Sequence, residues 1–234
     1  MSELPQPQYS IRRAQQPPEF RGLWDGPAWG RVGELDVAHF LPHSSDHRPR
    51  TLAKLLHSGA GLHVLFRVFD RYVRCAHAGH QIPAWRESCV EAFLHPRPDK
   101  GYFNFEMTCG GSLLLFYVSD WTPQPDQGKQ LTKFEPLPNE LLDTIRVYHS
   151  MPRTLPEEIQ EPVEWRVEYL VPWKLFETYL GSLGPIVGQT WRANFYKCAD
   201  DSSHPTWASW SPLPSRGFHQ PAHFGHLVFE DRAT

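Results

Sequence analysis

The chain has 234 residues, 40% of them hydrophobic, which is enough to build one large domain around a real core. Its 23 basic and 26 acidic residues leave a net charge of −3, so it carries no general electrostatic attraction for nucleic acid or for an anionic membrane surface. Its 23 prolines disfavour long helices and central strands, and therefore favour many short strands joined by long loops.

The N-terminal region gives no sign of a membrane or export segment. No apolar run in the sequence approaches the roughly 20 residues that a membrane-spanning helix requires, and the first 20 residues lack the apolar stretch of a secretory signal. We therefore expect a cytoplasmic protein as the sequence is written, or a periplasmic or secreted one if a leader is missing. Residues 1–18 are polar and proline-rich and are expected to form an arm before a single domain over residues 19–234. We expect a monomer.

Period-two alternation of apolar side chains predicts most of the strands, since successive residues of a strand point to opposite faces. The pattern is clearest in two stretches, where every second residue from Leu62 to Val68 and from Val163 to Val171 is apolar or aromatic. The full set of predicted strands is 51–57, 62–70, 88–94, 102–107, 113–118, 144–149, 163–171, 191–198 and 227–229.

The remaining segments are assigned to one helix and to loops. Pro172 begins the only helix that we predict, over residues 173–180, and Gly181 ends it. Two polar, proline-containing stretches, 121–139 and 152–162, are expected to be loops. Many short strands with irregular loops indicate an all-β fold, namely an antiparallel β-sandwich of immunoglobulin-like or jelly-roll-like type with one short helix.

Three of the predicted strands carry polar side chains opposite their apolar face. These side chains are Glu91, Asn104, and the pair Arg192 and Asn194. If the three polar faces coincide, they form a concave surface that can hydrogen-bond hydroxyl groups. The alternative is a set of solvated residues on the open side of an antiparallel sheet.

Six stretches, in this order, resemble the carbohydrate-binding modules of family 9 and their stand-alone relatives. They are LHVLFRVFD (62–70), WRESCVEAFLHP (85–96), YFNFEMTCGG (102–111), WRVEYLVPWKLF (165–176), WRANFYKC (191–198) and WASWSP…FHQPAHFG (207–225). The resemblance covers nearly the whole chain after residue 50. It implies an antiparallel β-sandwich that binds a mono- or oligosaccharide, has no catalytic activity, and binds neither nucleic acid nor membrane.

The resemblance also implies a site in which two tryptophans sandwich a sugar ring and polar side chains bind its hydroxyls. Trp85 and Glu91 match one tryptophan and the glutamate-bearing strand that follows it, whereas Trp207 and Trp210 are both candidates for the second tryptophan. The predicted carbohydrate-binding residues are Trp85, Glu91, Asn104, Arg192, Asn194, Trp207 and Trp210.

Metal and thiol chemistry are only weakly indicated. Sugar binding requires no cofactor, but the resemblance implies structural calcium, which takes six to eight oxygen ligands. Asp70 and the turn 200–203 are the places that could contribute such ligands. The four cysteines contain no CxxC pair, which argues against a zinc ribbon or a thioredoxin-type site, and Cys89 is expected to be a buried thiol.

Two other functions stay open at this stage. A glycan hydrolase needs two carboxylates about 5–9.5 Å apart, and Glu91 with Glu106 on a neighbouring strand could meet that distance. Glu87 and Glu91 are too far apart, since four residues of a strand span about 13 Å. The second alternative is a β-sandwich interaction scaffold without a sugar site, in which Trp85 and the C-terminal tryptophan would both be buried.

Overall fold

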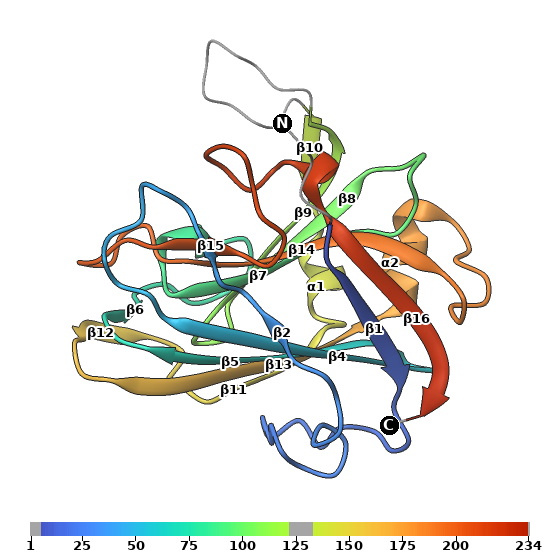
Figure 1. Cartoon of the computed structure of the whole chain (residues 1–234), viewed down its shortest axis with the longest axis horizontal. Coiled ribbons are helices and arrows are strands. Elements are labelled where there is room, and N and C mark those ends of the chain that lie inside the picture. Colours follow the sequence, from blue (N-terminus) through green and yellow to red (C-terminus); the bar gives the residue numbers. More distant parts are fainter. Residues whose placement is uncertain (1–5, 122–132, 234) are drawn as a thin grey trace.

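The computed structural model describes residues 6–121 and 133–233, and its strands form one curled sheet whose two halves stack as layers (Figure 1). The upper layer in Figure 1 contains, in sheet order, β10 (Lys133–Pro136), β9 (Leu113–Asp120), β8 (Tyr102–Thr108), β7 (Cys89–His95), β14 (Thr190–Cys198) and β16 (Gly225–Ala233). The lower layer continues with β1 (Gln8–Arg13), β4 (Arg50–Ser58), β5 (Gly61–Asp70), β13 (Val163–Pro172) and β11 (Arg146–His149). Short strands β2 (Leu35–Asp36), β3 (His39–Phe40) and β15 (Trp207–Ser209) attach beside this path, and β6 (Val73–Cys75) pairs with β12 (Leu155–Ile159).

The predicted antiparallel β-sandwich is confirmed, with one exception at the junction of the layers. Strand β1 pairs in parallel with both β16 and β4 and so connects the two layers. The expectation that residues 1–18 form an arm is therefore wrong for residues 8–13. Tyr9 and Ile11 alternate toward the core and are buried, and their burial fixes this strand in the sheet.

The core between the layers consists of the apolar faces that the alternation predicts. Phe66 of β5 lies 6.5 Å from Tyr169 of β13 and 6.2 Å from Phe195 of β14, measured between ring centroids. Phe105 of β8 lies 6.4 Å from the same tyrosine. Aromatic rings from both layers thus pack against one another at distances typical of favourable ring pairs.

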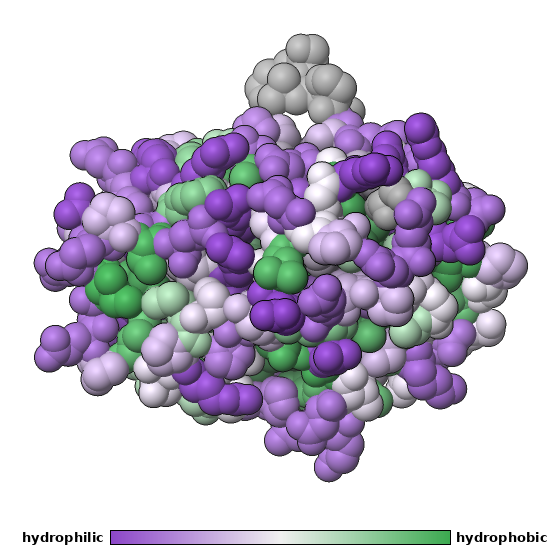
Figure 2. All heavy atoms as spheres, turned by 90° about the horizontal axis from the view of Figure 1, so that it is seen from below, coloured by the Kyte–Doolittle hydropathy of each residue, from purple (hydrophilic) through white to green (hydrophobic). Residues whose placement is uncertain are grey.

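A second, smaller apolar cluster covers the outer face of the lower layer. Trp24 and Trp29, from the segment after β1, pack there against Leu52 and Leu65. The buried ammonium of Lys54 donates hydrogen bonds to the backbone carbonyls of both tryptophans, each at 3.1 Å. Figure 2, which views the molecule from below, shows mainly hydrophilic side chains on this underside, with apolar ones in small groups.

The predicted helix is confirmed as α2 (Trp173–Leu180), and Gly181 ends it with a φ of 75°, a left-handed conformation that favours glycine. A second helix that the sequence did not predict, α1 (Asn139–Leu142), has one turn. No helix among the described residues is long and apolar enough to cross a membrane.

Parts of both expected loops are strands. Residues 133–136, within the expected loop 121–139, form the edge strand β10 against β9, while residues 122–132 lie outside the described part of the chain. Residues 155–159, within the expected loop 152–162, form β12 against β6. Both short strands obtain their backbone hydrogen bonds from a partner that is distant in sequence, so local composition did not reveal them.

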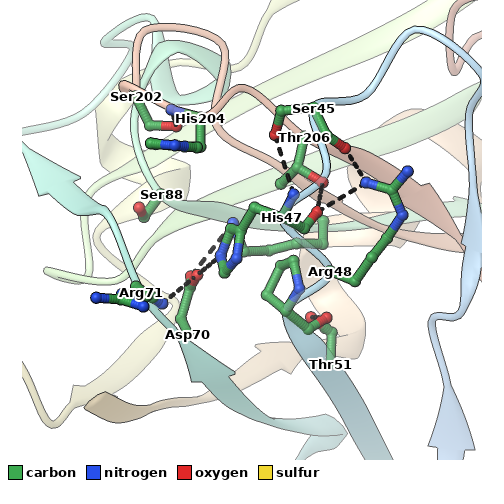
Figure 3. Close-up of polar contacts among 12 residues, drawn as sticks. Ser45, His47, Arg48, Thr51, Asp70, Arg71, Ser88, Ser202, His204 and Thr206 are labelled. Carbon is green, nitrogen blue, oxygen red and sulfur yellow. Dashed lines mark hydrogen bonds and ion pairs between the residues drawn. The ribbon is translucent and has the colours of Figure 1, made fainter. Parts of the chain in front are cut away.

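A buried ion pair joins the two layers at one end of the sandwich. Lys197 of β14 places its ammonium 3.4 Å from a carboxylate oxygen of Asp70, the last residue of β5. The indole Nε1 of Trp165 donates to the same carboxylate at 3.0 Å, and His47 Nε2 lies 2.8 Å from its other oxygen. Figure 3 shows His47 reaching Asp70 from the segment before β4, with Arg71 beside them.

The surroundings of Asp70 favour its ionised form. Burial by itself would raise the pKa of this carboxyl, but the Lys197 ammonium and the hydrogen bonds from His47, Arg71 and Trp165 outweigh burial and lower the pKa from 3.8 to about 2. The folded state therefore binds the proton less tightly than the unfolded state. The resulting stabilisation is present above about pH 4 and is lost as the pH falls toward 2.

We predict that Asp70→Asn lowers the free energy of unfolding at pH 7 by at least roughly 2 kcal/mol, the amount that corresponds to a pKa shift of nearly two units. The variant should also lose stability less steeply than the wild type as the pH falls from about 4 to 2. Urea unfolding at a series of pH values measures both effects. Asp36→Asn, on the exposed side of β2, is the control and should change neither. Equal acid sensitivity in Asp70→Asn and the wild type would contradict the prediction.

Candidate functional site

A cavity of about 370 Å³ lies on the outer face of the upper layer. Its floor comes from β7, β8 and β14, the strands whose opposite faces line the core. Aromatic side chains form much of its wall. The lining residues are Leu41, His43, Trp85, Glu91, Phe93, Asn104, Glu106, Phe116, Phe134, Cys198, Asp200, Trp207, Arg216, Gly217, Phe218 and His219.

Two of the predicted tryptophans line this cavity and are held by the same turn. Trp85 lies in the single-turn helix Ala84–Arg86, and its backbone carbonyl accepts a hydrogen bond from Asp200 N at 3.1 Å. Trp207 of β15 donates from its indole Nε1 to the side chain of Asp200 at 2.7 Å. The Trp85 side chain is 41% exposed, and Trp207 is half-buried. Asp200 therefore fixes both the backbone of Trp85 and the ring of Trp207 at the cavity.

The polar floor is made by residues that face one another across two strands. Glu91 of β7 is directly opposite Glu106 of β8 in the antiparallel register. Asn104 donates from Nδ2 to Glu106 Oε1 at 2.8 Å, and its own oxygen accepts from the backbone N–H of Phe116. The Cys198 thiol donates to Glu91 Oε1 at 3.0 Å. One oxygen of each glutamate, Oε2, is buried without a hydrogen-bond partner among the described residues.

Removal from water controls the protonation of these carboxyls. Burial raises the pKa of Glu106 to about 8, although the hydrogen bond from Asn104 opposes the shift. Burial also raises the pKa of Glu91 well above its usual range, and the nearby Cys198 and Glu106 raise it further. The floor is therefore a place where negative charge is unfavourable unless a ligand brings hydrogen-bond donors or positive charge.

Three predicted site residues, Arg192, Asn194 and Trp210, do not line the cavity. Trp210 is only 7% exposed and packs in the core at 5.7 Å from Phe195 between ring centroids. Asn194 is fully buried, donates to Ser211 O at 3.1 Å and accepts from the backbone N–H of the same serine. The stretch after β15 thus folds over this end of β14 and occupies the polar groups that the sequence had assigned to a ligand.

The hydrogen-bonding groups of Arg192 are likewise occupied by backbone carbonyls of the C-terminal stretch. Its guanidinium donates to the carbonyl oxygens of Phe224, with Nε at 2.9 Å, and of Ala222 at 3.2 Å. Hydrogen bonds to these carbonyls hold the turn Pro221–His223 in front of β16. Arg192 therefore stabilises this turn, and it does not line the cavity.

The structure adds residues to the site that sequence reasoning did not select. Cys198 and Asp200 lie at and just after the end of β14, and His43, Phe134 and Arg216 come from distant segments. The alternation did carry a signal for Cys198, because it follows Arg192, Asn194 and Tyr196 on the outward face. The other four come from loops or an edge strand, where no periodicity exists to read.

The residues that the sequence offered for calcium do not fit that ion. The carboxylate of Asp70 faces the Lys197 ammonium and three further nitrogen groups, from His47, Arg71 and Trp165. In the turn 200–203, Asp201 forms an ion pair with Arg86 at 2.7 Å, while Asp200 accepts from Trp207. Calcium requires several free oxygen ligands around one point, and these carboxylates are already engaged with nitrogen donors.

Comparison with known proteins identifies the family. The family model of carbohydrate-binding family 9 matches residues 31–229, which include both layers and every residue of the cavity. This chain belongs to carbohydrate-binding family 9. The family 9 assignment confirms the resemblance found in the six sequence stretches. No curated protein matches the chain in sequence.

Solved structures show the same fold as this family 9 chain. A protein from Bacteroides uniformis to which carbohydrate binding is ascribed has a TM-score of 0.82 and 26% identity, over 97% of this chain and 100% of that one. A family 9 module from Caldicellulosiruptor kristjanssonii in complex with cellotriose has a TM-score of 0.63 and 15% identity, over 97% of this chain and 95% of that one. A family 9 module from the same organism, in complex with glucose, has a TM-score of 0.61 and 16% identity, over 95% of this chain and 96% of that one.

We predict that truncation of Trp210 destabilises this family 9 chain much more than truncation of Trp85. Trp210→Ala removes a ring from the core and should lower the free energy of unfolding by about 3–5 kcal/mol. Trp85→Ala removes a largely exposed ring and should cost at most about 1 kcal/mol. Urea unfolding of both variants measures the difference. A large loss of stability in Trp85→Ala would mean that this ring is part of the fold and not of the site.

Proposed function

We propose that the cavity binds a sugar ring without catalysing a reaction. The observation that carries the proposal is the combination of Trp85 and Trp207 with a desolvated floor of carboxyl and amide groups in one cavity. Sugar rings offer apolar C–H faces and hydroxyl edges. A site that stacks aromatic rings on the faces and hydrogen-bonds the edges therefore suits them. Membership of family 9 and the glucose and cellotriose complexes of the C. kristjanssonii modules support the same ligand class.

The aromatic wall supplies the stacking surface. Besides Trp85, Phe134 of β10 is 48% exposed and packs 5.0 Å from Phe116, measured between ring centroids. Exposed aromatic rings of this size are unfavourable in water and gain free energy when a ligand covers them. The cavity volume is at the lower end of the roughly 300–1,000 Å³ typical of small-molecule sites, which suits one or two sugar rings.

The floor supplies the hydrogen bonds. The buried Oε2 atoms of Glu91 and Glu106 have no partner among the described residues, and an unpaired buried oxygen costs about 1–3 kcal/mol. Hydrogen bonds with the hydroxyl groups of a sugar would give these oxygens partners and remove that cost. We therefore assign Glu91 and Glu106 to hydroxyl recognition, with Asn104 holding Glu106 in place.

A hydrolase is the weaker reading of the same carboxyl pair. Glycoside hydrolysis with retention uses one ionised carboxylate as nucleophile beside one protonated acid. Here burial raises the pKa of both groups, and in the part of the chain that the structure describes neither carboxyl forms an ion pair with a lysine or an arginine. Both carboxyls are therefore disposed to be protonated at neutral pH, which suits hydrogen bonding and leaves no nucleophile. A scaffold without a site is also disfavoured, because Trp85 is exposed at an open cavity.

We predict that the protein binds glucose, cellobiose or cellotriose with a dissociation constant of millimolar or below, and that Trp85→Ala weakens binding about tenfold. The loss corresponds to roughly 1.5 kcal/mol for one stacked ring. Isothermal titration calorimetry with each sugar gives both values. The matched control is Phe69→Ala, which removes an exposed ring (37% exposed) from β5 of the other layer and should leave binding unchanged. No binding by any of the sugars, or equal binding in Trp85→Ala, would refute the proposed site.

We predict that the wild-type protein releases no product from cellotriose or from a nitrophenyl β-glucoside. Product chromatography after prolonged incubation tests this, with Glu91→Gln as the companion variant. If the wild type hydrolyses either compound, and if Glu91→Gln loses turnover while it still binds the sugar, the protein is a hydrolase and the non-catalytic proposal fails.

A further inference from the structure

Beneath the sugar cavity, two cysteines and a glutamate come together from strands that are distant in sequence. Cys89 begins β7 and lies directly opposite Cys198, the last residue of β14, in the antiparallel register. Glu91, two residues after Cys89, points to the same face of β7. One ligand atom of each of the three residues lies within 4.8 Å of the other two, and all three residues are buried.

We propose that Cys89, Glu91 and Cys198 form a binding site for Zn²⁺ or a similar thiophilic divalent cation. The proposal shares Glu91 with the proposed sugar site but does not rest on sugar binding, since it requires only these three side chains and access through the cavity. It assigns to the protein a ligand class that differs from the oxygen-bound calcium considered above.

The donor set and its spacing fit zinc. Two cysteine sulfurs and one carboxylate oxygen are ligands that Zn²⁺ takes at about 2.3 Å and 2.0–2.2 Å. Two sulfurs bound to one tetrahedral ion lie about 3.8 Å apart at that bond length. Atoms that are already within 4.8 Å of one another therefore need to move by about 1 Å at most. Cys198 Sγ and Glu91 Oε1 are at 3.0 Å, which is close enough to share an ion.

An unpaired atom indicates that this group is incomplete by itself. Glu91 is 2% exposed, and its Oε2 has no hydrogen-bond partner among the described residues. A cation bound among the three side chains would give this oxygen a partner and would contact both cysteine sulfurs at once.

The site is also reachable and leaves a coordination position open. Cys198 and Glu91 both line the sugar cavity, so an ion can enter from there. Three protein ligands leave the fourth tetrahedral position to water from the cavity. On binding, the two thiols and the Glu91 carboxyl each release a proton to solvent, and lone pairs of the two sulfurs and the carboxylate oxygen form the bonds to the ion. No oxidant or reductant is involved.

The other thiol pair of the chain provides a matched control. Cys75 and Cys109 are buried and close enough to interact, but Cys75 Sγ contacts Thr108 Oγ1 and the carbonyl of Arg153 instead of a carboxylate. Neither of them lines the cavity, and among the described residues no third metal-binding side chain joins them. They match the number and burial of the proposed ligands without the carboxylate.

The test is equilibrium dialysis of the reduced full-length protein against Zn²⁺, with metal counted by atomic emission. We expect one Zn²⁺ per chain. Cys89→Ser and Cys198→Ser should each weaken binding at least a hundredfold, and Glu91→Gln at least tenfold. The double variant Cys75→Ser/Cys109→Ser should still bind one equivalent. Absence of stoichiometric binding, or its loss in the Cys75/Cys109 variant alone, would overturn the proposal.

A spectroscopic measurement on the wild type keeps the test valid if the cysteine variants fail to fold. The X-ray absorption spectrum of the Zn²⁺-loaded protein should show two sulfur neighbours at about 2.3 Å and lighter atoms at about 2.0–2.2 Å. A first shell of nitrogen and oxygen only would mean that surface histidines bind the ion, and the proposal would be wrong. A disulfide between Cys89 and Cys198 that persists under non-chelating reducing conditions would also overturn it.

Discussion

The alternation of side chains along β7, β8 and β14 is the constraint on which both the core and the site depend. A strand sends successive side chains to opposite faces, so each of these strands contributes to the sandwich interior and to the cavity floor at once. Val90 and Phe105 pack in the core, while their neighbours Glu91 and Glu106 face the cavity. A register slip of one residue would move the carboxyls into the core, and the buried apolar face prevents it.

Two buried groups of polar side chains, one around Asp70 and one around Glu91 and Glu106, differ in how their charge is balanced. Around Asp70 the chain supplies its own cation, Lys197, together with nitrogen donors, so the carboxyl is ionised and the two layers are joined. Around Glu91 and Glu106 it supplies a thiol and an amide, and among the described residues neither carboxyl forms an ion pair. The first group is complete and stabilises the fold. The second lacks partners, which is the physical state expected of a site that a ligand completes.

The sequence allowed the sandwich, the core faces and part of the site to be predicted, because each depends on local periodicity. Val163 to Val171, the helix that Gly181 ends, and the outward position of Glu91 all follow from spacing alone. Strand β1 was not predicted, because Tyr9 and Ile11 are its only large apolar residues and the surrounding segment is polar and proline-rich, which is typical of an arm. The position of Lys197 could have predicted its buried ion pair. It lies on the same strand face as Trp191, Ala193 and Phe195, where a lysine requires a buried partner.

Taken alone, the sequence determined which side of each strand is apolar and which is polar, since that depends only on a period of two. It could not determine which polar side chains stay open to a ligand. Asn194 and Arg192 share the outward face of β14, but the chain from Ser211 to Phe224 folds over them and takes up their hydrogen bonds. Trp210 is buried while Trp207, three residues earlier, lines the cavity. These differences arise from contacts between segments far apart in sequence, and only the tertiary structure decides them.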